Sequence, residues 1–266
     1  TFTQDSGLPL SLKNFIGYYH LDPRSIYGKF SFSRLCADAG VLDDFIEPAE
    51  SILTKAFSKL VAVDSRRWIK FLTDILPRFS CELAASLSDF EKRMLQMFYI
   101  TVFQEAADWR SHTTRANMQL LADSPIMMHE LNELLSFNLE RIDFIDQPVP
   151  LGFDCPLDLH CTYTRDQILI AMDYMTPKNM REGVKWLPDK QVDVFFITLN
   201  KADKDYSPTT MYNDYSINES LFHWQSQSTT SDTASTGQRY INHRQRGSKV
   251  VLFVREFKQD SIGAAP

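Results

Sequence analysis

Residues 146–150 read Asp-Gln-Pro-Val-Pro, and this stretch divides the 266-residue chain into two parts of different character. Two prolines within three residues forbid a continuing helix and stiffen the connection. The 15 basic and 20 acidic residues before Gln147 give a net charge of −5, whereas the 13 basic and 14 acidic residues from Gln147 onward give −1. The sequence predicts an α+β protein, with an all-α helical domain over residues 1–147 and a β-rich domain over residues 148–266.

The first part has the spacing of packed amphipathic helices. Ser88-Asp89-Phe90-Glu91 is a capping box, and apolar side chains follow it at helical intervals. Ser124-Pro125 is a second helix start, a Ser cap followed by Pro at the first helical position. The stripe buried by that second helix is predicted to contain Met128, Leu131 and Leu135. Six to eight helices are expected, with their aromatic residues in the core.

The second part changes to the period of β-strands. A helix over Thr164–Met175 comes first, opened by a capping box at Thr164-Arg165-Asp166-Gln167. Strands are then expected at 183–187, 192–199, 220–225, 239–243 and 250–257, from their β-branched and aromatic content. Long polar loops at 200–215 and 225–238 start at strand ends, where a scaffold can aim side chains. A small mixed barrel or sheet is the expected architecture.

Composition indicates an ordinary globular protein, with 44% hydrophobic and 23% charged residues. The four cysteines are scattered, and no apolar run approaches the roughly 18 residues of a membrane span. We therefore expect reduced thiols in a cytoplasmic protein that is neither exported nor embedded in a membrane. The first residues, TFTQDSG, lack a Met, which is typical of an excised fragment.

Motifs for catalysis are missing or incomplete. The chain contains no GxxxxGK[ST], GxGxxG, HExxH or GxSxG sequence. Cys155, His160 and Cys161 have no common zinc spacing and no fourth ligand, so a buried thiol pair beside a strand is the better interpretation. Glu256-Phe257-Lys258 resembles half of a restriction-type nuclease motif, but the nearby upstream acid, Asp232, is in a Ser/Thr-rich loop. We expect no catalysis, no metal and no cofactor.

Residues 222–230, FHWQSQSTT, combine an indole with neutral amides and hydroxyls. Such groups suit a nucleic-acid base that has left its stack, with amides on the base edge and hydroxyls on phosphate or sugar. The alternative is that Trp224 is a core residue at a strand end. A nearby basic run, RYINHRQRGSK at 239–249, is either a phosphate-binding ribbon or a solvated hairpin. The predicted DNA-binding residues are Tyr206, Ser207, Trp224, Gln225, Ser226, Gln227, Thr229, Arg239, Arg244, Arg246 and Lys249.

A resemblance extends these inferences. From about Tyr163 to the end, through KDYSPTTMYNDYSI, FHWQSQSTT and TGQRYINHRQRGSKVVLFVR, the chain resembles a bacterial domain family of unknown function found C-terminal to DEAD/DEAH-box helicases. The helical part resembles, more weakly, the preceding region, through Ser33–Gly40 (SRLCADAG). Some members look like SauUSI-type, modification-dependent (type IV) restriction enzymes, which carry a nuclease domain, a helicase, a helical coupler and a domain similar to the SET-and-RING-associated (SRA) fold.

The resemblance implies a PUA-like or SRA-like barrel that reads a flipped, modified cytosine in double-stranded DNA, within an anti-phage protein that also holds helicase and nuclease domains. Family members continue past Gly263–Pro266, which leaves an incomplete barrel or a natural variant as alternatives. The first functional hypothesis is thus a non-catalytic recognition and coupling region. The others are a protein-interaction module that docks on the helicase, and a cryptic magnesium-dependent nuclease built on Glu256 and Lys258.

Overall fold

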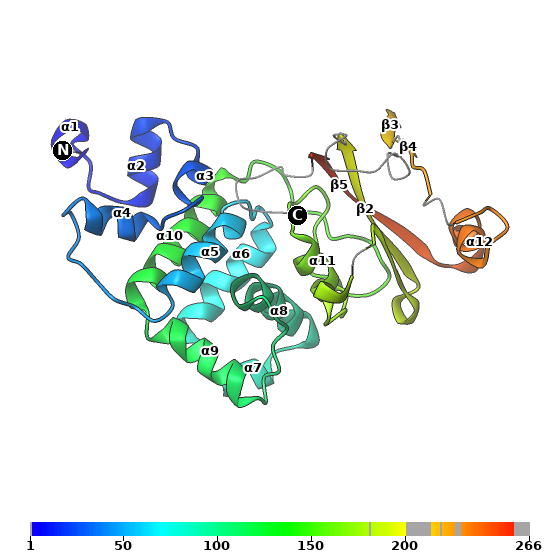
Figure 1. Ribbon diagram of the computed structural model, residues 1–266, viewed down its shortest axis with the longest axis horizontal. Helices are drawn as coiled ribbons and strands as arrows, with labels where there is room; N and C mark the ends of the chain where they lie inside the picture. The colour runs from blue at the N-terminus through cyan, green and yellow to red at the C-terminus, as the bar shows by residue number, and fades with distance from the viewer. Residues whose placement is uncertain (1, 181, 201–213, 219, 227–229, 258–266) are drawn as a thin grey trace. The chain divides into compact units, whose positions relative to one another are not determined.

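The computed structural model describes residues 2–180, 182–200, 214–218, 220–226 and 230–257. These residues divide into two compact units (Figure 1). The helical unit contains residues up to Pro150 together with Asp154–Pro177, and the sheet unit contains Leu151–Phe153 and the described residues from Lys178 to 257. The chain is therefore α+β, as the sequence predicts.

The helical unit is built around α10, Pro125–Arg141, which contacts α2, α4, α5, α6 and α9. The described residues before Pro150 form ten α-helices and one 3-10 helix, more than the six to eight expected, because several are shorter than two turns. Those other than α10 are α1 Phe2–Ser6, α2 Leu12–Tyr19, α3 Pro23–Ile26, α4 Phe32–Asp38, α5 Glu50–Leu60, α6 Arg66–Ile75, η1 Leu76–Arg78, α7 Cys81–Ser86, α8 Asp89–Phe103 and α9 His112–Ala122. Fully buried Trp68, Phe57 and Phe98 lie in its core.

Local capping patterns predict two helix starts correctly. Ser88 and Glu91 form both bonds of a capping box at the start of α8, and Thr164 and Gln167 do so at the start of α11, Arg165–Ala171. At the third start the helix begins at Pro125 as predicted, but Ser124 makes no cap bond. Its hydroxyl accepts a hydrogen bond from Ala49 N (2.9 Å) and donates to Leu120 O (2.8 Å).

The cap of α10 comes from a distant residue instead. Glu47 accepts hydrogen bonds from Ile126 N (2.8 Å) and Met127 N (2.9 Å). A carboxylate at a helix N-terminus satisfies free amides and also interacts favourably with the helix dipole. In the buried stripe, Met127 takes the place predicted for Met128, which is half-buried.

Helix α11 belongs to the helical unit by packing, although it follows the two prolines in the sequence. Its residues Gln167–Ala171 are buried, and it contacts α8. Gln167 Nε2 donates to Thr101 Oγ1 on α8 at 2.8 Å. The units therefore divide after Pro177, whereas the composition changes after Gln147.

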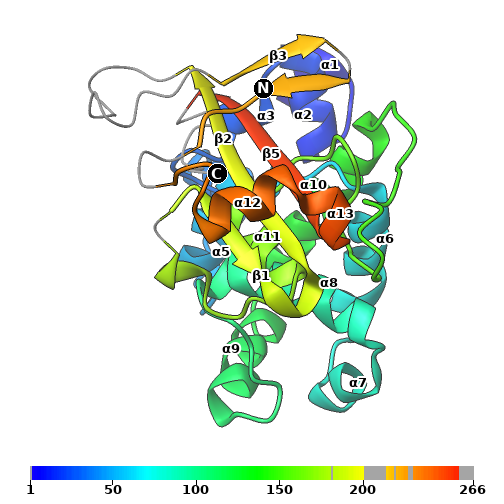
Figure 2. The same ribbon diagram turned by 90° about the vertical axis from the view of Figure 1, so that its right-hand side faces the viewer.

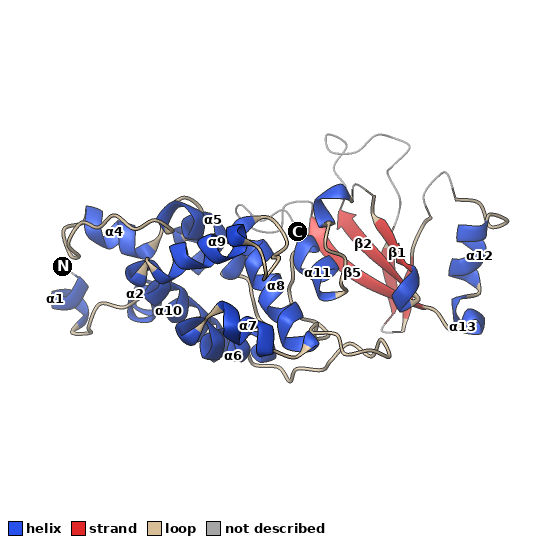
Figure 3. Ribbon diagram, turned by 90° about the horizontal axis from the view of Figure 1, so that it is seen from below, coloured by secondary structure: helices blue, strands red, loops and turns tan. Residues whose placement is uncertain are grey.

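The sheet unit contains a three-stranded mixed sheet of order β1-β2-β5. Strand β1, Val184–Leu187, is antiparallel to β2, Val192–Asn200, and β2 is parallel to β5, Lys249–Phe257. Parallel strands require a crossover, and here it holds the hairpin of β3, Tyr215–Asn218, and β4, Leu221–His223, followed by α12, Ser235–Ile241, and α13, His243–Arg246. Helix α12 lies against one face of the sheet (Figures 2 and 3). Short 3-10 helices occur at η2, Pro177–Asn179, and η3, Pro188–Lys190.

Two predictions for this unit need correction. Residues 239–243 form the end of α12 and the start of α13 rather than a strand, so the basic run is helical and not a hairpin. Tyr and Ile favour strands on average, but contacts of Arg239 and Tyr240 with β2 override that preference. The described residues form sheets of three and two strands and no closed barrel. None of the helices in the described ranges has both the length and the hydropathy of a membrane-spanning segment.

Candidate functional site

The sheet face covered by α12 has a buried carboxylate on its middle strand, near the start of that strand. Asp193 on β2 is fully buried, and the strand register puts Trp186 of β1 opposite it. Phe195 lies two residues further along β2, so its side chain is on the same face. A buried carboxylate in a run as apolar as VDVFFITL requires a partner, because an unpaired buried charge is very costly.

Arg239 of α12 is that partner. Its Nε donates to Asp193 Oδ2 at 2.8 Å and its Nη2 to Asp193 Oδ1 at 2.9 Å, a bidentate ion pair. The guanidinium also lies 4.3 Å from the centroid of the Trp186 ring. The hydrogen bonds with Asp193 raise the pKa of Arg239. Arg239 thus fastens α12 to the sheet, and its donors toward Asp193 are already used.

Trp224 joins an aromatic cluster on the same face. Its ring centroid is 4.2 Å from that of Phe195 and 5.5 Å from that of Tyr240, and Tyr240 is 5.1 Å from Phe195. Desolvation raises the pKa of the Tyr240 hydroxyl. Trp224 is half-buried. It therefore has features of both predicted alternatives: its ring packs against other rings as a core residue does, and it keeps some of the exposure that contact with a base requires.

Close packing also fixes the start of α12. A Cβ on Gly237 would lie 2.0 Å from Ser231 O, so a larger residue cannot be accommodated without movement of the backbone. Gln238 Nε2 donates to Asp232 O at 2.7 Å, across the same contact. The turn at 231–234 and the helix that follows therefore form one tightly packed element.

The exposed cations follow on α13. Arg244 and Arg246 are exposed, whereas Lys249, at the start of β5, is half-buried. Arg255, further along β5, donates from Nε to Thr198 Oγ1 at 2.7 Å. No acidic residue occurs from 233 to 255, so this segment is basic throughout. Of the predicted cationic residues, Arg244 and Arg246 have the exposure that a phosphate contact needs.

The neutral polar residues are only partly described. Gln225 is exposed, and its N donates to Asp214 Oδ1 at 2.9 Å. Ser226 Oγ donates to Thr230 O at 3.3 Å. The remaining predicted residues lie outside the described part of the chain: Tyr206, Ser207, Gln227 and Thr229.

Residues that the sequence interpretation missed are Asp193 and the pair Tyr215 and His223. Asp193 could have been noticed as a lone acid within an apolar strand. Tyr215 and His223 are opposite each other in the β3–β4 hairpin, with ring centroids 4.8 Å apart and planes at 27°. Both residues are exposed. Their pairing depends on the hairpin register, which the sequence alone did not give.

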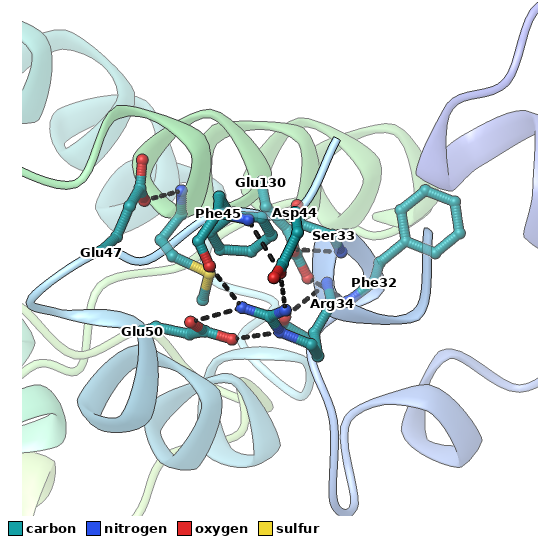
Figure 4. A network of polar contacts seen from close by, with 10 residues as sticks. Phe32, Ser33, Arg34, Asp44, Phe45, Glu47, Glu50 and Glu130 are labelled. Carbon is teal, nitrogen blue, oxygen red and sulfur yellow. Dashed lines mark hydrogen bonds and ion pairs between the residues drawn. The ribbon is translucent and has the colours of Figure 1, made fainter. Parts of the chain in front are cut away.

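The segment Ser33–Gly40 of the helical unit is also explained by its contacts. Arg34 donates from Nε to Glu50 Oε1 (2.6 Å), from Nη1 to Asp44 Oδ1 (2.6 Å) and from Nη2 to Phe45 O (2.8 Å) (Figure 4). Its guanidinium lies 4.4 Å from the Phe45 ring centroid. One arginine thus holds the chain between α4 and α5.

Glu130 stabilises the start of the same segment from α10. Its carboxylate accepts hydrogen bonds from Phe32 N (2.6 Å) and Ser33 N (2.8 Å) (Figure 4). Burial raises the pKa of Glu130, and these hydrogen bonds only partly oppose that shift. The signature-like sequence therefore has a structural role, as the joint between α4, α5 and α10.

In the described ranges, no group of three His, Cys, Asp or Glu side chains is placed so that it could hold a metal ion. Cys36, Cys155 and Cys161 are free thiols. Burial raises the pKa of Cys155 to about 11 and that of Cys161 to about 12, so neither is an activated nucleophile. Both precede α11 and belong to the helical unit.

The structure describes two of the three residues of the nuclease hypothesis. Glu256 is exposed near the end of β5, Asp232 is exposed in the turn before α12, and Lys258 lies outside the described residues.

A cleft of about 510 Å³ in the helical unit includes Asp22, Arg24 and Asp64 in its lining. Arg24 donates to Asp22 from Nε (2.9 Å) and Nη2 (2.6 Å), so its charge is already matched.

Comparison with known proteins gives one match. Residues 157–265 match a family model described as a domain of unknown function (DUF3427). The match starts in the helical unit, ahead of α11, and extends over the sheet unit. Searches among curated proteins and among solved structures found no match.

Proposed function

We propose that this chain is a non-catalytic DNA-recognition and coupling region of an ATP-dependent helicase–nuclease in anti-phage defence. The sheet unit binds double-stranded DNA and reads a modified cytosine that is flipped from the helix. Its sheet is part of a PUA-like or SRA-like barrel. The helical unit couples this recognition to helicase and nuclease domains of the same parent chain.

The observation that carries the proposal is the exposed arginine pair on α13. Arg244 and Arg246 are exposed within a segment that contains no acid from 233 to 255, on a chain whose net charge is −6. Local positive charge on an acidic protein is the expected feature of a phosphate-binding surface. The Asp193–Arg239 pair fixes α12 on the sheet, so α13, which follows it directly, is attached to an ordered element.

The test is a pair of charge-matched double variants. Arg244→Gln/Arg246→Gln should weaken binding to every duplex and reduce the slope of log K against log salt by about 0.9 for each lost phosphate contact. Arg110→Gln/Arg115→Gln removes the same charge from exposed positions of the helical unit and should change neither. Equal effects of the two variants would show that only net charge matters.

Recognition of a modified base is tested separately. One duplex is compared with its 5-methylcytosine version at fixed salt, and tighter binding to the methylated duplex is expected. The neutral residues Gln225 and Ser226 are proposed to lie near the base, with Tyr206, Ser207, Gln227 and Thr229 from segments outside the described residues. Equal affinity for the two duplexes would refute base recognition and leave general DNA binding standing.

Absence of catalysis by this chain is part of the proposal. Magnesium-dependent nicking that survives repurification and disappears in Glu256→Ala would contradict it and favour the nuclease hypothesis instead.

A second candidate function, protein docking by the helical unit, is favoured by the loop that Arg34 holds. Ile46 in this loop is 97% exposed and Val41 60% exposed. Binding is stronger when the contact surface is already ordered, and the loop is fixed by contacts of Arg34 and Glu47. Ile46→Asp should weaken association with the helicase region added as a separate chain, and Lys55→Asp, on α5, is the exposed control.

A further inference from the structure

The β3–β4 hairpin exposes rings and apolar side chains that its own fold does not use. All four residues of β3 are exposed, including Tyr215 at 51% and Ile217 at 55%, and Leu221 of β4 is 57% exposed. Two-stranded hairpins are marginally stable alone and gain stability from packing against something else. This hairpin lies beyond one end of the three-stranded sheet (Figures 1 and 2).

The base of the hairpin is nevertheless well fixed within the sheet unit. Asp214, just before β3, accepts the hydrogen bond from Gln225 N at 2.9 Å. Trp224, just after β4, packs on Phe195 of β2 and on Tyr240 of α12. The hairpin is therefore attached to the same scaffold as the cations of α13.

The stacked rings of Tyr215 and His223 form an exposed flat surface on this scaffold. They are parallel to within 27°, at 4.8 Å between centroids, and both residues are exposed. Trp224, by contrast, is half-buried and has Phe195 and Tyr240 as ring neighbours. A nucleobase can extend an exposed stack of aromatic rings, because every base has a π-face.

We propose that Tyr215 and His223 form a stacking platform for an unpaired nucleobase of DNA, with Trp224 as the support of the hairpin rather than the ring that meets the base. This inference rests on the proposed DNA binding and adds to it the element that receives the base. Charge supports the choice of a nucleic acid over a protein, because the platform shares its scaffold with the acid-free segment 233–255. Phosphate contacts by Arg244 and Arg246 would hold the strand whose base stacks on the platform.

The experiment uses three DNA probes that share one sequence: a single strand, a duplex with one bulged nucleotide and a fully paired duplex. The bulged or central nucleotide is 2-aminopurine, whose fluorescence falls when it stacks. Tyr215→Ala should weaken binding to the single strand and to the bulged duplex by about tenfold, the effect of losing one stacked base. It should leave 2-aminopurine bright in the complex and change binding to the paired duplex by less than twofold.

Two further variants separate stacking from hairpin stability. Tyr215→Phe keeps the ring and should retain the affinity and the fluorescence quenching of the unaltered protein. Ile217→Ala truncates another exposed residue of β3 and should bind as the original protein does. His223→Ala should repeat the effect of Tyr215→Ala, because it removes the second ring of the stack.

The outcomes distinguish this inference from the function on which it rests. Unchanged binding and quenching in both Ala variants, while Arg244→Gln/Arg246→Gln still weakens all three probes, would overturn the platform and leave DNA binding intact. Equal losses on all three probes with Tyr215→Ala would also overturn it, because stacking of an unpaired base cannot affect paired DNA alike. Failure of the unaltered protein to bind any probe would refute the proposed function itself.

Discussion

Replacing Asp193 by Ala tests whether Arg239 belongs to the fold or to the DNA-binding surface. The two side chains are 0% and 18% exposed and share two hydrogen bonds of 2.8 and 2.9 Å. Breaking a buried ion pair by removing one partner costs about 3–5 kcal/mol. Because Arg239 keeps some contact with water, we expect Asp193→Ala to lower the stability of the sheet unit by about 2–3 kcal/mol.

Arg239→Ala should cost more, about 3–5 kcal/mol, since it leaves the fully buried Asp193 carboxylate without its cation. The double variant should cost clearly less than the sum of the two, with an interaction energy of about 1.5–3 kcal/mol. Hydrogen exchange of the β2 amides is the suitable assay, because it reports on this unit alone. Asp189→Ala removes an exposed carboxylate of the same unit and should change stability by less than about 0.5 kcal/mol.

DNA binding by Asp193→Ala also distinguishes the two roles of Arg239, because they predict opposite changes in affinity. If Arg239 were a phosphate ligand, Asp193→Ala would release it and strengthen binding. Since Arg239 fixes α12, we expect weaker binding instead. A loss of less than about 1 kcal/mol, additive single variants, or tighter DNA binding would each refute this account of the pair.

Three further predictions follow from local geometry. Gly237→Ala should destabilise the sheet unit by about 1–3 kcal/mol through its clash with Ser231 O, whereas Gly17→Ala in α2, with nothing within 4 Å, should stabilise the helical unit by about 0.5–1 kcal/mol; urea unfolding measures both. Burial raises the pKa of Glu130 above its usual value of 4.5, so its contribution to stability is present below that pH and is lost as pH rises through the folded value. Glu130→Gln should therefore flatten that part of the pH–stability curve. Trp224→Ala should cost about 1.5–3 kcal/mol of sheet-unit stability, less than a fully buried Trp, and β2 amide exchange should show it.

Sequence patterns predicted those features whose partners are close along the chain. The capping boxes at Ser88 and Thr164 form because donor and acceptor are three residues apart, so the motif contains the whole interaction. Strands β1, β2 and β5 were predicted near their observed bounds, because the β-branched and aromatic content that indicates a strand lies within the strand itself. The α+β organisation followed from these elements.

Predictions failed where the decisive partner is distant. Ser124 looks like a cap, but Glu47, 79 residues away from the amide it binds, supplies the cap of α10. Arg239 looks like a free cation until Asp193, 46 residues away, is placed beside it. The strand predicted at 239–243 failed for the same reason, because tertiary contacts of α12 outweigh the preference of its residues.

Helix α11 bears on how such a chain is inherited. The family match starts at residue 157, yet Gln167–Ala171 are buried in the helical unit, and Gln167 is bonded to Thr101. A recombination event that joined the matched segment to an unrelated preceding domain would separate α11 from α8. It would expose the surface of α8 that α11 covers and leave the buried Gln167 amide without its hydrogen-bond partner. Exchange after Pro177 would leave that contact intact. Residues of α8 and α11 should therefore vary together among relatives, while the sheet unit is free to diversify as a separate cassette.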